Sequence, residues 1–154
     1  MSWQPAAPVD ALPARARMLH SIRAFFMARD VLEVETPALS HAANTDPAIA
    51  SLETRVMSSR CFLHTSPEFP MKRLLAAGSG DIYQICKVFR DGESGRYHNP
   101  EFTLLEWYRT GFDEHALIDE VLALIRLLAG EDLDSVKMTY RELFQQSLGI
   151  DPQR

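Results

Sequence analysis

The sequence has little of what marks a secreted, membrane-bound or metal-binding protein. Its 154 residues include two cysteines, Cys61 and Cys86, which form no C-x-x-C pair, so we expect no disulfide framework and a reduced, cytoplasmic setting. No run approaches 18 consecutive apolar residues and no apolar signal segment is visible, so no membrane association is expected. No metal-ligand spacing links the cysteines to the histidines, so no metal site is predicted. The five histidines are His20, His41, His64, His98 and His115.

Positive charge is also scarce. The chain has 16 Lys and Arg against 21 Asp and Glu, a formal net charge of −5. An acidic chain lacks the basic face that broad nucleic-acid binding needs, so tRNA is not an expected partner. Apolar residues, by contrast, make up 46% of the chain beside 24% charged residues, which is the balance of a soluble globular domain.

Hydrophobic periodicity predicts an α+β domain over residues 14–154, behind a proline- and alanine-rich tail over residues 1–13. Helices are predicted over 13–30, 66–78 and 113–130, and from a capping box at 139–142 to about Leu148. Strands are predicted over 31–36, 51–57, 60–64, 81–90 and 102–108, with loops over 40–47 and 91–100. We therefore expect an antiparallel sheet built around one long hairpin, with helices packed on it.

The last predicted strand carries a carboxylate in an apolar setting. Alternation places Phe102, Glu106 and Tyr108 on one face of this strand. A carboxylate there needs a partner, because burial of an unpaired charge is costly. Two explanations stay open: an internal ion pair of Glu106 with Arg73 or Arg90, or a ligand ammonium held by Glu106 and Tyr108 beside a flat group stacked on Phe102.

The connection before this strand is rich in groups that bind anions. Arg90, Arg96 and His98 place two guanidinium groups and an imidazole around one turn. Guanidinium groups match the geometry of phosphate bidentately, which suits a nucleotide. The alternative is a solvated basic turn, because no glycine-rich phosphate loop accompanies these residues.

A third candidate is the segment Ser66, Pro67 and Glu68. A serine before a helix with an acidic first turn is explained by helix capping alone. The alternative is that the same residues contact a substrate.

Together these segments resemble the class II aminoacyl-tRNA synthetases of the lysine, aspartate and asparagine group. Within that group they are most similar to the lysyl-tRNA synthetase paralogues that modify elongation factor P. The helix with V-L-E-V-E-T-P, about 15–39, resembles motif 1 of the family, and T-S-P-E-F-P-M-K-R-L-L-A-A-G resembles its substrate-side segment. Residues of about 81–109, with H-N-P-E-F-T-L-L-E-W-Y, resemble motif 2, the hairpin that holds ATP.

The resemblance implies an ATP-dependent ligase. It would activate a lysine-type amino acid, lysine or β-lysine, as the adenylate and transfer it to a lysine of elongation factor P. The implied catalytic residue is Arg90, which would neutralise the α-phosphate and the substrate carboxylate. The implied substrate-binding residues are Ser66, Pro67, Glu68, Glu106 and Tyr108. The implied ATP-binding residues are Arg90, Asp91, Gly92, Glu93, His98, Asn99 and Phe102. Mg²⁺ is expected with ATP, with its ligands outside this chain.

Motif 1 implies a homodimer, and we expect the apolar helix face with Phe25 and Phe26 to meet the partner.

Two departures from the family stand out. The family's Arg-x-Glu reads Arg90-Asp91-Gly92-Glu93 here, so Glu93 is the candidate for the displaced adenine contact. Motif 3 has no counterpart, which implies the N-terminal half of a catalytic domain. Two alternatives stay open: a fragment of a lysyl-tRNA synthetase, and a non-catalytic dimerisation or regulatory half-domain.

Overall fold

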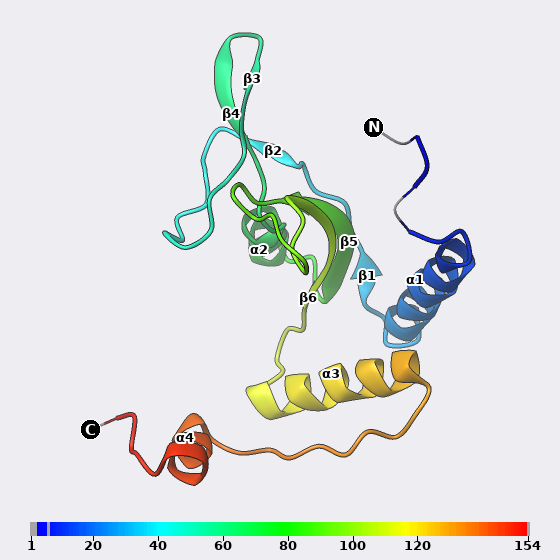
Figure 1. Cartoon of the computed structure of the whole chain (residues 1–154), viewed down its shortest axis with the longest axis vertical. Coiled ribbons are helices and arrows are strands. Elements are labelled where there is room, and N and C mark those ends of the chain that lie inside the picture. Colours follow the sequence, from blue (N-terminus) through cyan, green and yellow to red (C-terminus); the bar gives the residue numbers. More distant parts are fainter. Residues whose placement is uncertain (1–2, 6, 154) are drawn as a thin grey trace.

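The computed structural model describes residues 3–5 and 7–153 of the chain (Figure 1). The helices of this part are α1 (Ala11–Met27), α2 (Glu68–Ala76), α3 (Glu114–Ala129) and α4 (Tyr140–Leu148). The strands are β1 (Leu32–Glu33), β2 (Leu39–Ser40), β3 (Glu53–Val56), β4 (Ser59–Leu63), β5 (Ile82–Phe89) and β6 (Glu101–Tyr108). The predicted α+β class is confirmed, and each predicted helix is present within a few residues of its expected bounds.

The strands form two small sheets in the described part of the chain. One has the order β2-β4-β3 and is antiparallel throughout. The other has the order β1-β5-β6, and its long hairpin β5–β6 pairs over eight residues from Ile82 opposite Tyr108 to Phe89 opposite Glu101. Strand β1 joins this hairpin in parallel, unlike the antiparallel sheet predicted. The chain crosses over through the second sheet and α2 before it returns to β5, and such a crossover permits parallel pairing.

The core lies between the hairpin and helices α1 and α3. Phe26 is fully buried, stacked on Tyr83 with ring centroids 4.5 Å apart and tilted against Trp107 at 5.4 Å. Phe25 is only 5% exposed in the same cluster. The expectation that Phe25 and Phe26 meet a partner subunit is therefore wrong, because both rings fill the chain's own core.

Local capping signals explain the later helices. The Asp113 side chain accepts a hydrogen bond from the Ala116 amide at 2.8 Å at the start of α3, and Gly130 ends this helix in a left-handed conformation with φ of 71°. Thr139 and Glu142 form the predicted capping box of α4. Figure 1 shows α4 at the end of an extended segment that follows α3.

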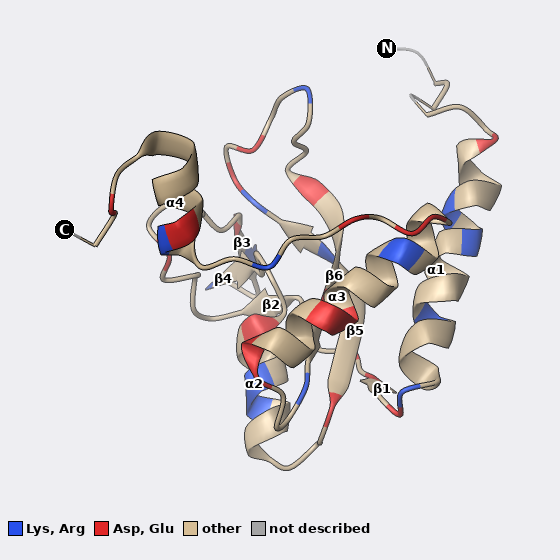
Figure 2. Cartoon of the chain, turned by 90° about the horizontal axis from the view of Figure 1, so that it is seen from below, with Lys and Arg blue, Asp and Glu red and all other residues tan. Residues whose placement is uncertain are grey.

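Charges of both signs are mixed along the chain. Figure 2 shows Lys or Arg together with Asp or Glu on α2 and on α3, whereas the charged residues of α1 are all arginines, Arg15, Arg17 and Arg23. Within the residues that the structure describes, no helix is long and apolar enough to cross a membrane.

Candidate functional site

The candidate site lies on the face of the β5–β6 hairpin that points away from the core. Tyr83 and Trp107 are opposite each other and face α1, so the next residue pair, Gln84 and Glu106, faces the other way. By the same alternation, this outer face carries two rows of side chains. They are Gln84, Cys86, Val88 and Arg90 from β5 and the residue after it, and Phe102, Leu104, Glu106 and Tyr108 from β6.

Glu106 is half-buried on this face, and none of the described residues gives it a cationic partner. The Tyr108 hydroxyl donates a hydrogen bond to Glu106 Oε1 at 2.7 Å. No Lys, Arg or His nitrogen of the described residues lies within 4.0 Å of its carboxylate, so neither Arg73 nor Arg90 forms the internal ion pair considered above. Burial and the bond to Glu106 raise the pKa of Tyr108, and the negative charges of Glu106 and Glu68 raise it further.

Arg90 lies at the other end of the same face. Its guanidinium carbon is 5.0 Å from the centroid of the Phe102 ring, and its backbone amide donates to the Pro100 carbonyl at 2.9 Å. Arg90 Nε is buried and has no hydrogen-bond partner in the described part of the chain. A buried donor is normally satisfied, so an open guanidinium beside an aromatic ring suits a ligand with both an anionic and a flat group.

The loop between the strands folds back on itself. The backbone amide of Gly92 donates to Asp91 Oδ1 at 2.9 Å, and φ of 76° at Gly92 favours glycine. Glu93 Oε2 lies 3.7 Å from His98 Nε2, so two of the predicted ATP contacts face each other. Asn99 is exposed at the end of the loop.

The predicted substrate segment begins α2. Ser66 Oγ accepts a hydrogen bond from the Glu68 amide at 3.2 Å, but the N-cap of α2 is the buried Pro67, so Ser66 lies one residue before the predicted capping position. Unlike Glu106, Glu68 has a cationic partner, since its Oε1 lies 2.5 Å from Lys72 Nζ. Both carboxylates act on Tyr108, so Glu68 lies near the outer face of the hairpin.

A cavity of about 360 Å³ adjoins the start of α2. It is lined by Ser66, Glu68, Phe69 and Arg73 and by residues of 37–51 and 63–65, but not by Arg90 or Glu106. The predicted site residues therefore form two groups: those at the cavity, such as Ser66, and those on the outer face of the hairpin, such as Arg90 and Glu106. Glu68 lines the cavity and also acts on Tyr108 of the outer face.

Sequence reasoning missed a buried polar residue opposite Glu106 in the hairpin. Gln84 is 3% exposed, and its Oε1 accepts a hydrogen bond from Thr36 Oγ1 at 2.9 Å. Gln84 also acts against burial in setting the pKa of the Cys86 thiol, which it lowers. Alternation along residues 82–89 would have placed Gln84 and Cys86 on one face of their own strand. Only the pairing of β5 with β6 shows that this is the face that carries Glu106.

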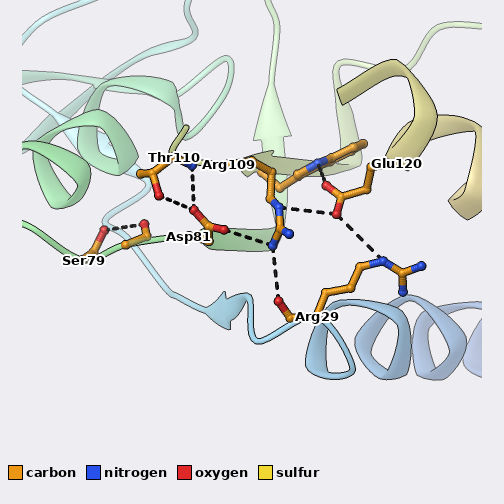
Figure 3. A network of polar contacts seen from close by, with 8 residues as sticks. Arg29, Ser79, Asp81, Arg109, Thr110 and Glu120 are labelled. Atoms are coloured by element: carbon orange, nitrogen blue, oxygen red, sulfur yellow. Dashed lines mark hydrogen bonds and ion pairs between the residues drawn. The ribbon is translucent and has the colours of Figure 1, made fainter. Parts of the chain in front are cut away.

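A buried ionic junction, drawn in Figure 3, follows directly after Tyr108. Arg109 Nη1 lies 3.1 Å from Asp81 Oδ2, and Arg109 Nε lies 3.4 Å from Glu120 Oε1. Arg29 Nε approaches the same Glu120 oxygen at 3.9 Å, and Thr110 donates twice to Asp81. The junction joins the end of β6 to the start of β5, to α1 and to α3, and so fixes the strand that carries Glu106 and Tyr108.

The described residues do not supply a metal-binding cluster. No group of three or more His, Cys, Asp or Glu side chains in this part of the chain is arranged to hold a metal ion.

Comparison with known proteins gives concordant results. The model of the tRNA synthetases class II (D, K and N) matches residues 7–148. An "Elongation factor P--(R)-beta-lysine ligase" of Pseudoalteromonas translucida (strain TAC 125) is 52% identical over 97% of this chain and 48% of its own length. The protein of that name from Vibrio cholerae serotype O1 is 53% identical over the same shares. The chain thus spans about half the length of these relatives.

Among solved structures, the asparaginyl-tRNA synthetase from Pyrococcus horikoshii complexed with asparaginyl-adenylate superposes with a TM-score of 0.70. The likeness covers 77% of this chain and 27% of that one, at 18% sequence identity. At this identity the superposition establishes the shared fold.

Proposed function

Because this chain belongs to the class II tRNA synthetases (D, K and N), we propose that it is the amino-acid-binding part of an ATP-dependent ligase. The ligase activates a lysine-type amino acid, lysine or β-lysine, and transfers it to a lysine side chain of elongation factor P. One observation carries the proposal: Glu106 is a half-buried carboxylate with a tyrosine hydroxyl bound to it and no cation within 4.0 Å among the described residues.

The activation step needs charge neutralisation more than covalent catalysis. The substrate carboxylate attacks the α-phosphorus of ATP, the bond to the leaving pyrophosphate breaks, and an aminoacyl adenylate forms. Two anions must approach each other, so a fixed guanidinium between them stabilises the transition state. Arg90 is the catalytic residue in this proposal, since its Nε is buried without a partner among the described residues and its guanidinium lies over the Phe102 ring.

The nucleotide is assigned to the same end of the hairpin. Phe102 stacks on the adenine, and His98 and Asn99 contact the nucleotide from the loop. Asp91, Gly92 and Glu93 shape that loop. For Glu93 to reach adenine it must leave His98, and the 3.7 Å separation of this exposed pair makes the rearrangement inexpensive. Mg²⁺ would screen the charge of the phosphates.

The ammonium groups of the amino acid are assigned to the other end. Glu106 and Tyr108 hold one of them, and Glu68, at the start of α2 with Ser66 and Pro67, exchanges its exposed partner Lys72 for the second. Lysine and β-lysine carry two ammonium groups and one carboxylate, which matches two carboxylates near Tyr108 and one arginine farther along the face.

The acceptor is inferred from the relatives. Proteins about 50% identical to almost the whole chain bear the name of an elongation factor P--(R)-beta-lysine ligase. Together with a net charge of −5, this favours a protein acceptor over tRNA. A translation factor as acceptor places the reaction in the cytoplasm. We also propose a homodimer through the motif 1 segment, where Met27 and Leu32 remain more than half exposed.

The test is ATP–pyrophosphate exchange with the folded chain, followed by transfer to elongation factor P detected by mass spectrometry. We expect exchange with lysine or β-lysine, none with aspartate or asparagine, and a mass increase of the factor. Charging of tRNA instead of the factor would identify a lysyl-tRNA synthetase fragment. Absence of exchange with every amino acid, in a chain that melts cooperatively, would favour the non-catalytic half-domain.

A further inference from the structure

Cys86 occupies the middle of the outer face of the hairpin. It lies opposite Leu104 in the β5–β6 register, two residues from Gln84 and four residues from Arg90. At ~3.4 Å per residue, its Cα is about 7 Å from the level of Glu106 and about 14 Å from that of Arg90. A ligand that reaches along this face from the guanidinium to the carboxylate therefore crosses the level of the Cys86–Leu104 pair.

The thiol lies beside a fixed carboxamide on the same face of the hairpin. Thr36 Oγ1 donates a hydrogen bond of 2.9 Å to Gln84 Oε1, and Gln84 acts against burial in setting the pKa of the Cys86 thiol, which it lowers. Gln84 is 3% exposed, whereas Cys86 is half-buried and retains access to the face. Because Cys86 is opposite Leu104 in the register, Cys86 and Glu106 are diagonal neighbours on this face. Burial raises the pKa of the Cys86 thiol, and the negative charge of Glu106 raises it further.

Two independent features indicate that a ligand covers this thiol. Glu106 has a neutral hydrogen-bond donor but no cation within 4.0 Å among the described residues. At the other end, Arg90 Nε is buried without a partner in that same part of the chain. An anion-binding group and a cation-binding group thus both lack a partner among the described residues, and Cys86 lies between them along the hairpin.

We propose that Cys86 is a specificity-determining residue whose thiol forms the floor under the carbon chain of a zwitterionic or dicationic ligand, and that Gln84 is its positioning residue. The identity of the ligand, an amino acid with a second ammonium group, rests on the proposed function. The placement of the Cys86 thiol beside the Glu106 carboxylate does not rest on the proposed function. The placement and the identity of the ligand are tested separately.

The experiment compares two thiol reagents of similar size on the full chain. One is 2-aminoethyl methanethiosulfonate, which is cationic, and the other is its neutral 2-hydroxyethyl analogue. In each case the Cys86 thiolate attacks the sulfenyl sulfur, a new S–S bond forms, and methanesulfinate leaves with the electron pair of the broken bond. Cys61→Ser removes the second cysteine, which is buried in β4, and Cys86→Ser shows that the signal belongs to Cys86.

We expect the cationic reagent to modify Cys86 roughly tenfold faster than the neutral one, because Glu106 attracts it. Glu106→Gln should abolish this preference, while Glu101→Gln, on the same strand but paired with Lys87, should keep it. Raising the salt concentration of the Cys61→Ser protein to about 1 M, where the Debye length is ~3 Å, should also reduce the preference, which tests the attraction without touching Glu106. Equal rates for the two reagents at low salt would overturn the proposal.

Protection by lysine separates this inference from the proposed function. Slower modification in the presence of lysine, but not of norleucine, supports both. A cationic preference without protection by lysine or β-lysine would keep Cys86 beside an open carboxylate and count against a lysine-type substrate. Gln84→Met, which keeps the size of the side chain, should lower the modification rate of Cys86 or its protection by lysine. A change in neither would remove Gln84 as the positioning residue.

Discussion

At the scale of single residues, the charged side chains of the candidate site differ in whether an oppositely charged side chain lies close to them. Glu68 pairs with Lys72, and Glu101 with Lys87, as exposed carboxylates commonly do. Glu106 and Arg90 lack such partners in the described part of the chain, although both are partly buried. Since burying an unpaired charge is costly, these two residues are the ones whose charge a ligand would balance.

Arg90 provides the first prediction. Arg90→Ala should slow adenylate formation by a factor of roughly 10²–10³, because one fixed charge at the reacting phosphate is lost. Arg90→Lys should restore little, since lysine lacks the planar fork. Arg96→Ala is the matched control, because Arg96 lies over its neighbour Tyr97 in the loop. Pyrophosphate exchange measures the effect, and similar rates for Arg90→Ala and Arg96→Ala would exclude Arg90 from the mechanism.

Sequence alone predicted part of this residue-level arrangement. Strict alternation was sufficient to place Phe102, Glu106 and Tyr108 on one face, and the register confirms that placement. Whether Glu106 pairs with Arg73 or Arg90 depended on the position of α2 and on the course of the loop, which no local pattern encodes. Gln84 looked like an ordinary strand residue, and only the register opposite Glu106 shows its place.

At the scale of secondary-structure elements, the ionic junction fixes the hairpin against its helices. Arg109 and Glu120 side chains are 10% and 5% exposed, and they join β6 to α3 while Arg29 adds α1 (Figure 3). The Trp107 indole also donates to Glu120 Oε2 at 3.0 Å. A shift of this junction would move Tyr108, its immediate neighbour in the chain, and with it the candidate site.

Removing one charge from this junction should therefore be costly. Glu120→Gln is expected to lower the free energy of unfolding by about 3 kcal/mol, because two arginines lose a buried partner. Asp119→Asn, on the same helix but in an exposed pair with Lys137, should change it by less than ~1 kcal/mol. Urea unfolding measures both variants, and equal small effects would show that the junction contributes nothing to stability.

The same junction predicts how stability depends on pH. Burial alone would raise the pKa of Asp81, but two hydrogen bonds from Thr110 and the charge of Arg109 outweigh it and lower the pKa below 3.8. A carboxyl with a depressed folded-state pKa contributes stability above its unfolded pKa and loses it as the pH falls through the folded value.

We therefore expect melting temperature to fall as the pH drops below about 4, and Asp81→Asn to flatten that part of the curve. Differential scanning calorimetry between pH 2 and pH 7 provides the curves. An unchanged acid limb in Asp81→Asn would assign the loss of stability to other carboxyls.

Elements with strong local signals were predicted well from sequence, and pairing between distant elements was not. Asp113 and Gly130 bound α3, and the capping box starts α4, because these signals act within one helical turn. Helix α1 begins at Ala11 rather than Pro13. The parallel pairing of β1 with β5 joins segments about 50 residues apart, and its two residues carry no pattern that specifies direction.

At the scale of the whole molecule, the chain spans about half the length of the relatives it matches. The apolar helix face that suggested a dimer proved to be core, since Phe26 is fully buried. Exposed apolar residues remain at other positions of the motif 1 segment, including Leu32 at 58% exposure. Self-association is thus proposed through a different surface from the one first expected.

Light scattering at micromolar concentration tests that proposal. We expect a dimer, and Leu32→Glu should shift it toward the monomer, because a charge would be buried at the contact. Met57→Glu, at the 96% exposed tip of the β3–β4 hairpin, should leave the dimer intact. A monomeric parent chain would refute the dimer, and equal effects of the two variants would place the contact elsewhere.

The central claim is that Glu106 holds a ligand ammonium, and calorimetric titration with lysine tests it most directly. Glu106→Gln should weaken lysine binding by ~2 kcal/mol or more, about 30-fold, while ATP binding and the melting temperature stay near those of the parent chain. Glu101→Gln, on the same strand but paired with Lys87, should bind lysine as the parent does. A Glu106→Gln protein that melts at a lower temperature but binds lysine unchanged would contradict the account, because Glu106 would then be a structural residue.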